Sequence, residues 1–273
     1  MLRLRRASLL AGIFLIAGCG GAPSRPQAGA AGPPPKPTQP IRLIAFVGSA
    51  AKPPALEAKA AYEKANPGVI VDMTFGGSGT VLQQMILEET GDIYMPGSDD
   101  YMEKAQARHA VIPQTRAIVA YLVPMICVQK GNPKKIRELA DLAGPGVTLG
   151  MAEPGAVCLG DVSAQILENA GLMEAVKKNI ITYAKSCEQT QQLVQLGEVD
   201  AVIGWDAFQN WAPDKIDVIP IPLQYGRVHS IPAAVSAYSQ QGEAAQRFIG
   251  FLTSAEGRAI FAKHGYTIEP PTS

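Results

Sequence analysis

Short apolar runs alternate with helical segments along this chain from residue 41 onward. Residues 41–47 form an apolar, β-rich run typical of a buried parallel strand, and residues 55–64 form a helix rich in Ala, Glu and Lys. A second such pair follows at residues 69–75 and 80–89. Further strands are expected at residues 91–95, 119–128, 147–151, 201–205, 216–222 and 233–238, and further helices at 101–107, 136–142, 163–170, 172–179, 190–196, 242–253 and 255–263. This alternation predicts an α/β fold with mostly parallel sheets that are covered by helices on both faces.

The first residues have the features of an export signal. Arg3, Arg5 and Arg6 precede an apolar stretch, residues 9–17, that is too short to cross a bilayer as a helix. The stretch ends in Ile-Ala-Gly-Cys, which resembles the lipobox of bacterial lipoproteins. We therefore expect residues 1–18 to be a lipoprotein signal peptide and Cys19 to carry lipid. An ordinary signal peptide with an incidental cysteine is the alternative.

The segment that follows has the composition of a linker. Residues 20–40 are rich in Pro, Gly and Ala and contain no Leu, Ile, Val or aromatic residue. Such a segment cannot bury a core, so residues 19–40 are predicted to be a disordered tether that begins at the lipidated cysteine. The leader, lipid and tether together predict a periplasmic or other extracytoplasmic domain that is anchored to a membrane.

The charge balance argues against binding to nucleic acid. The chain has 24 basic and 24 acidic residues, and without the three leader arginines 21 basic residues remain, which gives a net charge of −3. No basic run occurs beyond the leader. Proteins that neutralise phosphates cluster Lys and Arg, so this class of partner has no support.

Two neighbouring strand ends carry the same kind of loop. Ser49 follows Gly48 at the end of the first strand, and Ser78 lies in Gly-Gly-Ser-Gly at the end of the second. Ligands of open α/β sheets bind outside the carboxyl ends of strands, and the N–H groups of helix N-termini favour anions. The two loops therefore indicate a shared anion site. The alternative is that both serines only cap helices.

The sequence lacks the usual signatures of an enzyme. His109, His229 and His264 do not have the spacing of a metal motif, and no Walker loop is present. The loop around Ser78 is not the G-x-S-x-G nucleophile elbow. A Cys–His nucleophile is the remaining alternative, because proximity in the fold is not visible in the sequence. We therefore expect no catalytic residue, no resident metal and no cofactor.

Several segments in order along the chain resemble the molybdate-binding proteins of ABC importers. They are the surroundings of Ser49 and Ser78, residues 131–142, residues 152–160 and residues 197–203. The resemblance implies a two-lobed periplasmic-binding-protein fold with a cleft between the lobes. Residues 41–123 and 216–273 would form lobe 1, and residues 124–215 would form lobe 2.

The resemblance also implies how a ligand is held. The family binds a tetrahedral oxyanion with uncharged groups, and Ser49 and Ser78 match its two first-lobe serines. Leu159 and Cys187 fall where the second lobe presents backbone N–H groups. Trp205 falls where many members place a tyrosine whose hydroxyl donates to the anion.

Three cysteines remain after Cys19, and two of them depart from the family pattern. Cys158 takes a position where the family often has Pro, and Cys187 lies at the rim of the expected site. A disulfide between them is favoured because an exported protein meets an oxidising environment. A thiolate pair that binds a soft metal or thiophilic ligand is the next interpretation, and two unrelated buried thiols the third. Cys127 is expected in the core.

Acidic residues near the expected site leave two interpretations open. Asp206 follows Trp205 and would repel an oxyanion unless it faces solvent or caps a helix. Asp99 and Asp100, with Ser98, are expected to cap the helix that follows, and ligands for a cation are the alternative. Glu153 and Asp161 carry the same ambiguity.

Together these observations predict a substrate-binding lipoprotein of an ABC importer, with a membrane permease and an ATPase as partners. Molybdate or tungstate is the expected ligand. The alternatives are the same fold with a soft metal or thiophilic ligand at Cys158 and Cys187, or an envelope sensor or partner protein without a role in transport.

Overall fold

The computed structural model describes residues 40–270. The predicted signal peptide, the lipidation of Cys19 and nearly all of the predicted tether lie outside the described residues. Within residues 40–270, no helix is long and apolar enough to cross a membrane.

The first of two sheets begins with the two strands that precede the serine loops. Its order is β2-β1-β3-β10-β4, with strands β1 (Ile41–Gly48), β2 (Val69–Gly76), β3 (Ile93–Met95), β4 (Ala117–Leu122) and β10 (His229–Val235). β1 is parallel to β2 and β3, whereas β10 is antiparallel to both β3 and β4. The apolar residues of β1 are buried on both faces, as expected for a strand covered by helices.

The second sheet repeats this arrangement. Its order is β7-β6-β8-β5-β9, with strands β5 (Pro124–Gln129), β6 (Leu149–Ala152), β7 (Ile180–Ala184), β8 (Ala201–Trp205) and β9 (Ile216–Pro220). β6 is parallel to β7 and β8, and β5 is antiparallel to β8 and β9. Each sheet therefore has a three-stranded parallel part that contains the strand ends of interest, and the α/β, two-lobed fold class is confirmed.

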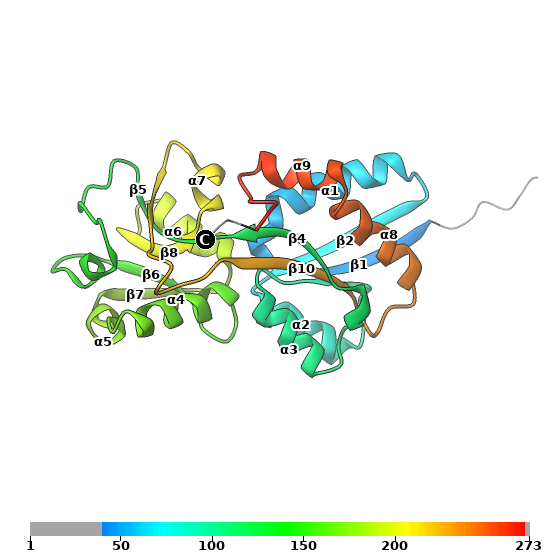
Figure 1. Ribbon diagram of the computed structural model, residues 1–273, viewed down its shortest axis with the longest axis horizontal. Coiled ribbons are helices and arrows are strands. Elements are labelled where there is room, and N and C mark those ends of the chain that lie inside the picture. The colour runs from blue at the N-terminus through cyan, green and yellow to red at the C-terminus, as the bar shows by residue number, and fades with distance from the viewer. Residues whose placement is uncertain (1–39, 271–273) are drawn as a thin grey trace, which may run out of the picture. The chain divides into compact units, whose positions relative to one another are not determined.

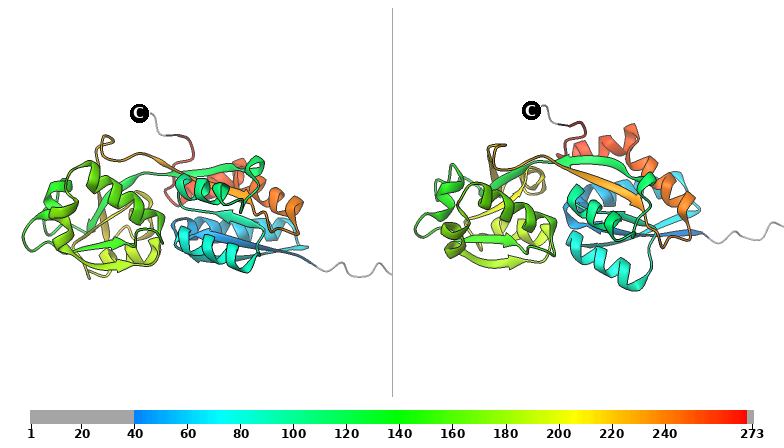
Figure 2. Two further views of the ribbon diagram at one scale, coloured as in Figure 1. Left: turned by 90° about the horizontal axis from the view of Figure 1, so that it is seen from below. Right: turned by 60° about the horizontal axis from the view of Figure 1, so that its bottom comes forward.

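Helices cover both faces of each sheet (Figure 1). On the first sheet, α1, α8 and α9 pack on one face, and α2 and α3 on the other. On the second, α4 and α5 lie opposite α6 (Figures 1 and 2). The helices are α1 (Lys52–Ala65), α2 (Ser78–Glu88), α3 (Asp99–Ala107), α4 (Cys158–Asn169), α5 (Met173–Val176), α6 (Cys187–Gln195), α7 (Ala207–Trp211), α8 (Gly242–Leu252) and α9 (Ala255–Lys263), with short 3-10 helices η1 (Ser49–Ala51), η2 (Pro113–Thr115), η3 (Leu139–Ala143) and η4 (Lys177–Asn179).

The chain crosses between the sheets twice, and the second crossing lies later than the sequence indicates. The apolar stretch at 119–128 is not one strand, because it divides at Val123 into β4 of the first sheet and β5 of the second. β9 pairs with β5, so residues 216–220 belong to the second lobe. The boundary expected at residue 216 is therefore wrong, and the chain returns after Pro220.

Local departures from the predicted elements have physical reasons. β7 was not predicted, because its alternating pattern lacks a long apolar run, and it lies at the edge of its sheet. β10 begins at His229, four residues earlier than expected. A proline within a run argues against a strand, so Pro232 conceals the early start in the sequence. The strand tolerates its missing N–H because Pro232 lies at a shift in the strand register.

Asp206 joins the first crossing to the second sheet. Its Oδ1 accepts hydrogen bonds from the backbone N–H of Val123 at 3.1 Å and of Ala207 at 3.0 Å, the latter capping α7. Burial raises the pKa of Asp206 to about 6, although these backbone donors act in the opposite direction. Asp206 is therefore a capping residue at the crossing.

The pKa of Asp206 gives a testable pH dependence. Between pH 4 and pH 6 the native protein holds a proton on this group more often than the unfolded chain does, so the group lowers the free energy of unfolding as the pH rises. Asp206→Asn keeps an Oδ1 acceptor without a charge. We expect the variant to gain stability relative to the parent between pH 4.5 and pH 7, on the order of 2 kcal/mol. Urea unfolding at the two pH values measures this difference, and parallel pH profiles would contradict it.

Candidate functional site

The two serines are brought together by the register of β1 and β2. Gly48 pairs directly with Gly76, so the two parallel strands end side by side. Ser49 begins η1 and Ser78 begins α2, and both are buried. A Cβ atom added to Gly48 would lie only 2.9 Å from Oγ of Ser78 and 2.6 Å from the backbone N of Gly97. The backbone of β1 therefore reaches the second serine only because residue 48 lacks a side chain.

Neither serine side chain caps its own helix. Gly48 and Gly77 occupy the N-cap positions, and no side-chain capping bond is made there. Instead, Oγ of Ser49 accepts a hydrogen bond from the backbone N–H of Cys187 at 2.9 Å. Oγ of Ser78 accepts one from the backbone N–H of Gly97 at 3.0 Å. The alternative in which the serines only cap helices is therefore wrong, and both hydroxyls face other elements of the fold.

Two helices of the second lobe begin near the two serines. Cys158 and Leu159 are the first residues of α4, and Cys187 is the first residue of α6. The first N–H groups of a helix have no partner within the helix, and the positive end of its dipole attracts anions. Ser49 contacts one of these N–H groups directly. The structure thus places Ser49, Leu159 and Cys187 around the same end of the second lobe.

Trp205 brings a buried donor to this place. It ends β8, its side chain has no solvent exposure, and its Nε1 has no hydrogen-bond partner of normal geometry. The indole acts to lower the pKa of the Cys187 thiol. Sulfur is a weak acceptor, so Trp205 retains a donor that a better acceptor would satisfy.

Cys158 and Cys187 are free thiols in the structure, so the favoured disulfide is not formed there. The neighbouring thiol of Cys187 lowers the pKa of Cys158, with further help from Ser78 and the charge of His229. The thiol of Cys158 and burial raise the pKa of Cys187. Cys127 lies apart from them in the core, and burial raises its pKa.

The lobes contact one another around the serines. The backbone N–H groups of Gly79 and Thr80, in the first turn of α2, donate to the carbonyl of Ala156 at 2.9 and 3.3 Å. A Cβ atom on Gly77 would lie 2.4 Å from the same carbonyl oxygen. Tyr101 and Lys104 of α3 both donate to Asp161 of α4 at 2.9 Å. These contacts hold the α2 and α4 ends together and enclose the serines.

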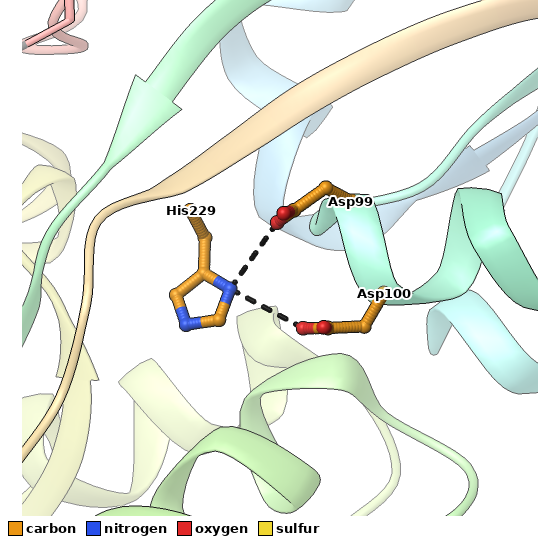
Figure 3. A group of neighbouring side chains, drawn as sticks. All are labelled: Asp99, Asp100 and His229. Atoms are coloured by element: carbon orange, nitrogen blue, oxygen red, sulfur yellow. Dashed lines mark ion pairs between the residues drawn. The ribbon is translucent and has the colours of Figure 1, made fainter.

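A polar cluster lies beside this site, at the second crossing (Figure 3). Arg227 donates to Oδ2 of Asp99 at 2.7 Å and to Oδ1 of Asp100 at 2.6 Å, and His229 faces both carboxylates. Burial alone would lower the pKa of His229, but Asp100 and Asp99 raise it. The ring of His229 packs edge-on against Trp205, with 5.6 Å between centroids.

This cluster was only half visible in the sequence. Asp99 and Asp100 were expected to help cap α3, but their side chains pair with Arg227 and His229 instead. Ser98 occupies the N-cap position without making a capping bond. Asp161 accepts from Tyr101, Lys104 and the backbone N–H of Gly155, and Glu153 pairs with Lys185. No local pattern marks Arg227 or His229, which lie about 130 positions from their partners.

Comparison with known proteins identifies the family. The model of the bacterial extracellular solute-binding proteins matches residues 43–267. The chain belongs to this family. It is 26% identical to the molybdate-binding protein ModA of Mycobacterium tuberculosis, over 94% of this chain and 95% of the relative.

Solved structures agree on the fold. The periplasmic molybdate-binding protein of Azotobacter vinelandii superposes with a TM-score of 0.73 at 18% identity, over 83% of this chain and 99% of that one. The sulfate-binding protein SubI of M. tuberculosis gives a TM-score of 0.71 at 18% identity, over 83% and 86%. The resemblance to molybdate-binding proteins is confirmed at the level of a divergent member. Family members are solute-binding proteins of ABC importers rather than enzymes.

The state of the cysteines can be measured directly. We expect alkylation of the denatured protein without reductant to modify Cys158 and Cys187 separately, because the structure has two thiols and no covalent bond between them. Mass spectrometry of the digested protein reads out both sites, and Cys127 serves as the internal control. A cross-linked pair of peptides that contain Cys158 and Cys187 would contradict this expectation.

Proposed function

We propose that this protein captures a tetrahedral oxyanion, molybdate or tungstate, at the place where Ser49 and Ser78 face the first turns of α4 and α6. The observation that carries the proposal is the convergence of two buried hydroxyls with backbone N–H donors, that of Cys187 from the other lobe and that of Gly97 from the same lobe. The relatives that bind molybdate support the choice of ligand.

The site can bind an anion although no fully charged side chain would contact the ligand. Hydroxyl and backbone N–H groups are neutral donors that are fixed in place, and helix N-termini add partial positive charge. An oxyanion would take the N–H of Cys187 from Ser49, and the hydroxyl would then turn to donate to the ligand. The unpartnered Nε1 of Trp205 would gain an acceptor in place of the sulfur. Each of these exchanges replaces a contact between neutral groups with a charge-assisted hydrogen bond.

Closure of the lobes over the ligand is part of the proposal. The contacts of Gly79 and Thr80 with Ala156 join the same helix ends that would surround the anion. Capture then shifts the balance between open and closed forms, and the closed form is the one that a membrane permease with its ATPase would recognise. We further propose export, acylation at Cys19 and attachment through the tether, from the sequence pattern of the leader.

A titration of the serine variants tests the proposal. Ser49→Ala and Ser78→Ala each remove one donor to a charged ligand, which costs about 1.5–3 kcal/mol, or roughly a 10- to 150-fold loss of molybdate affinity. Calorimetric titration of both variants measures the loss. Thr80→Ala is the matched control, because its side chain is exposed in the same helix turn. Absence of heat with molybdate, tungstate, sulfate and phosphate in the parent protein would remove the proposal.

A second candidate function follows from the free thiols. Cys158 and Cys187 are buried next to Ser78 and Ser49, and one has a lowered pKa, as suits a soft cation or thiophilic ligand. For this function we expect Ag⁺, as a soft-ion probe, to bind the parent protein with one ion per chain and to lose that binding in the double variant Cys158→Ser, Cys187→Ser. Cys127→Ala is the control. Equal Ag⁺ binding by all three proteins would exclude this candidate.

A further inference from the structure

The cluster at the second crossing offers three ligand atoms that converge on one point. Asp99 and Asp100 are the first two residues of α3, and His229 is the first residue of β10. Figure 3 shows the imidazole pointing between the two carboxylates. Nδ1 of His229, one oxygen of Asp99 and one oxygen of Asp100 all lie within 4.8 Å of one another. The fold thus brings together residues from the two separate sequence segments of lobe 1 in a His-Asp-Asp set.

The distances within this set are longer than those of ordinary hydrogen bonds. Nδ1 of His229 lies 3.4 Å from Oδ1 of Asp99 and 3.4 Å from Oδ2 of Asp100. The usual N–H···O distance is about 2.7–3.2 Å. A tetrahedral ion with bonds of about 2.1 Å holds its ligand atoms about 3.4 Å apart. The observed separations therefore match two edges of a zinc-type coordination tetrahedron.

Two of the three ligand atoms are buried without a hydrogen-bond partner. The side chain of His229 is 5% exposed, and neither its Nδ1 nor Oδ1 of Asp99 has a hydrogen-bond partner. Buried polar atoms are nearly always satisfied, so an orphaned donor or acceptor points to a missing partner. An ion between them would satisfy both atoms at once.

Arg227 fixes the orientation of the two carboxylates. It binds the other oxygen of each carboxylate, Oδ2 of Asp99 and Oδ1 of Asp100, and so fixes both groups with their remaining oxygens toward His229. Groups that hydrogen-bond to metal ligands orient them in this way. The guanidinium also balances one of the two negative charges, which leaves a net charge of −1 for a cation to neutralise when the imidazole is neutral.

We propose that Asp99, Asp100 and His229 bind a divalent transition-metal ion of the zinc type. A nitrogen ligand with two carboxylate oxygens suits such an ion, whereas Ca²⁺ requires six or more oxygens and Mg²⁺ an octahedral set. The fourth position faces a pocket of about 460 Å³ that Asp100, Arg227 and His229 line together with Lys104 and Asp161. The pocket supplies the entry path and room for a water ligand. The ion would tie the start of β10 to α3.

This site goes beyond the proposed oxyanion function and does not depend on it. The ring of His229 packs edge-on against Trp205, whereas its Nδ1 faces the two carboxylates. Metal binding can therefore be measured without any oxyanion present. A negative result for metal binding would leave the proposed oxyanion function untouched, because the anion titration tests that function separately.

Metal titration of the whole protein tests the proposal. After removal of bound metal with a chelator, we expect Zn²⁺ to bind with one ion per chain, and Co²⁺ to give the intense visible bands of four-coordinate geometry. His229→Gln and Asp100→Asn should each weaken Zn²⁺ binding by at least about tenfold, because each removes a ligand or its charge. His109→Gln is the matched control at an exposed histidine. Asp100→Asn also guards against misfolding, since this carboxylate is 42% exposed.

The thiols provide the decisive comparison. The double variant Cys158→Ser, Cys187→Ser should retain the single Zn²⁺ site. The Co²⁺ spectrum of the parent protein should lack thiolate charge-transfer bands. Loss of Zn²⁺ binding in this double variant would show that the cysteines bind the metal, and it would overturn the proposal. Absence of stoichiometric Zn²⁺ binding, or equal binding by the parent, His229→Gln and Asp100→Asn, would also overturn it and leave the cluster as an ion-pair network.

Discussion

The candidate site depends on the in-register parallel pairing of β1 and β2. Because Gly48 and Gly76 are partners, the chain leaves both strands at the same edge of the sheet. Two serines that are 29 positions apart in the sequence therefore lie close together, both buried, at that edge. A one-residue slip would turn the side chains of one strand to the opposite face. Gly48 and Gly77 then permit close approach, one to Ser78 and the other to Ala156 of the second lobe. The hydroxyls, helix ends and lobe contacts all follow from this pairing.

Much of the fold could be predicted from the sequence, because strand and helix patterns differ in period. The first turns of α4 and α6 could not. The sequence predicts a helix only over residues 163–170, whereas α4 begins at Cys158 and includes Gly160, where a side chain would lie 2.5 Å from the backbone of Glu153. The requirement for glycine is tertiary, and no local pattern shows it. As a result, the sequence located Leu159 and Cys187 only through the family resemblance, and not through their places at helix N-termini.

The polar cluster shows a second limit of sequence reasoning. Asp99 and Asp100 look like ordinary first-turn acidic residues, which favour the positive end of a helix. Arg227 and His229 reach them only because β10 returns to the first sheet between β3 and β4. The late crossing after Pro220 and the early start of β10 at His229 decide this contact. The crossing was predicted too early because the sequence does not show that β9 pairs with β5, and the start of β10 was predicted too late because Pro232 interrupts the strand pattern.

Two of the cysteines depart from the neutral oxygen and nitrogen donors that the resemblance to molybdate-binding proteins implies. Two thiols and an indole stand where the relatives' pattern implies proline, a backbone donor and tyrosine. The oxyanion interpretation requires that these groups shape the pocket without replacing the serines as donors. Anomalous scattering from crystals grown with molybdate tests this most directly. The account predicts a molybdenum peak within hydrogen-bond distance of Oγ of Ser49 and of Ser78, next to the first turns of α4 and α6. A peak bonded to the sulfurs of Cys158 and Cys187, or none near the serines, would contradict it.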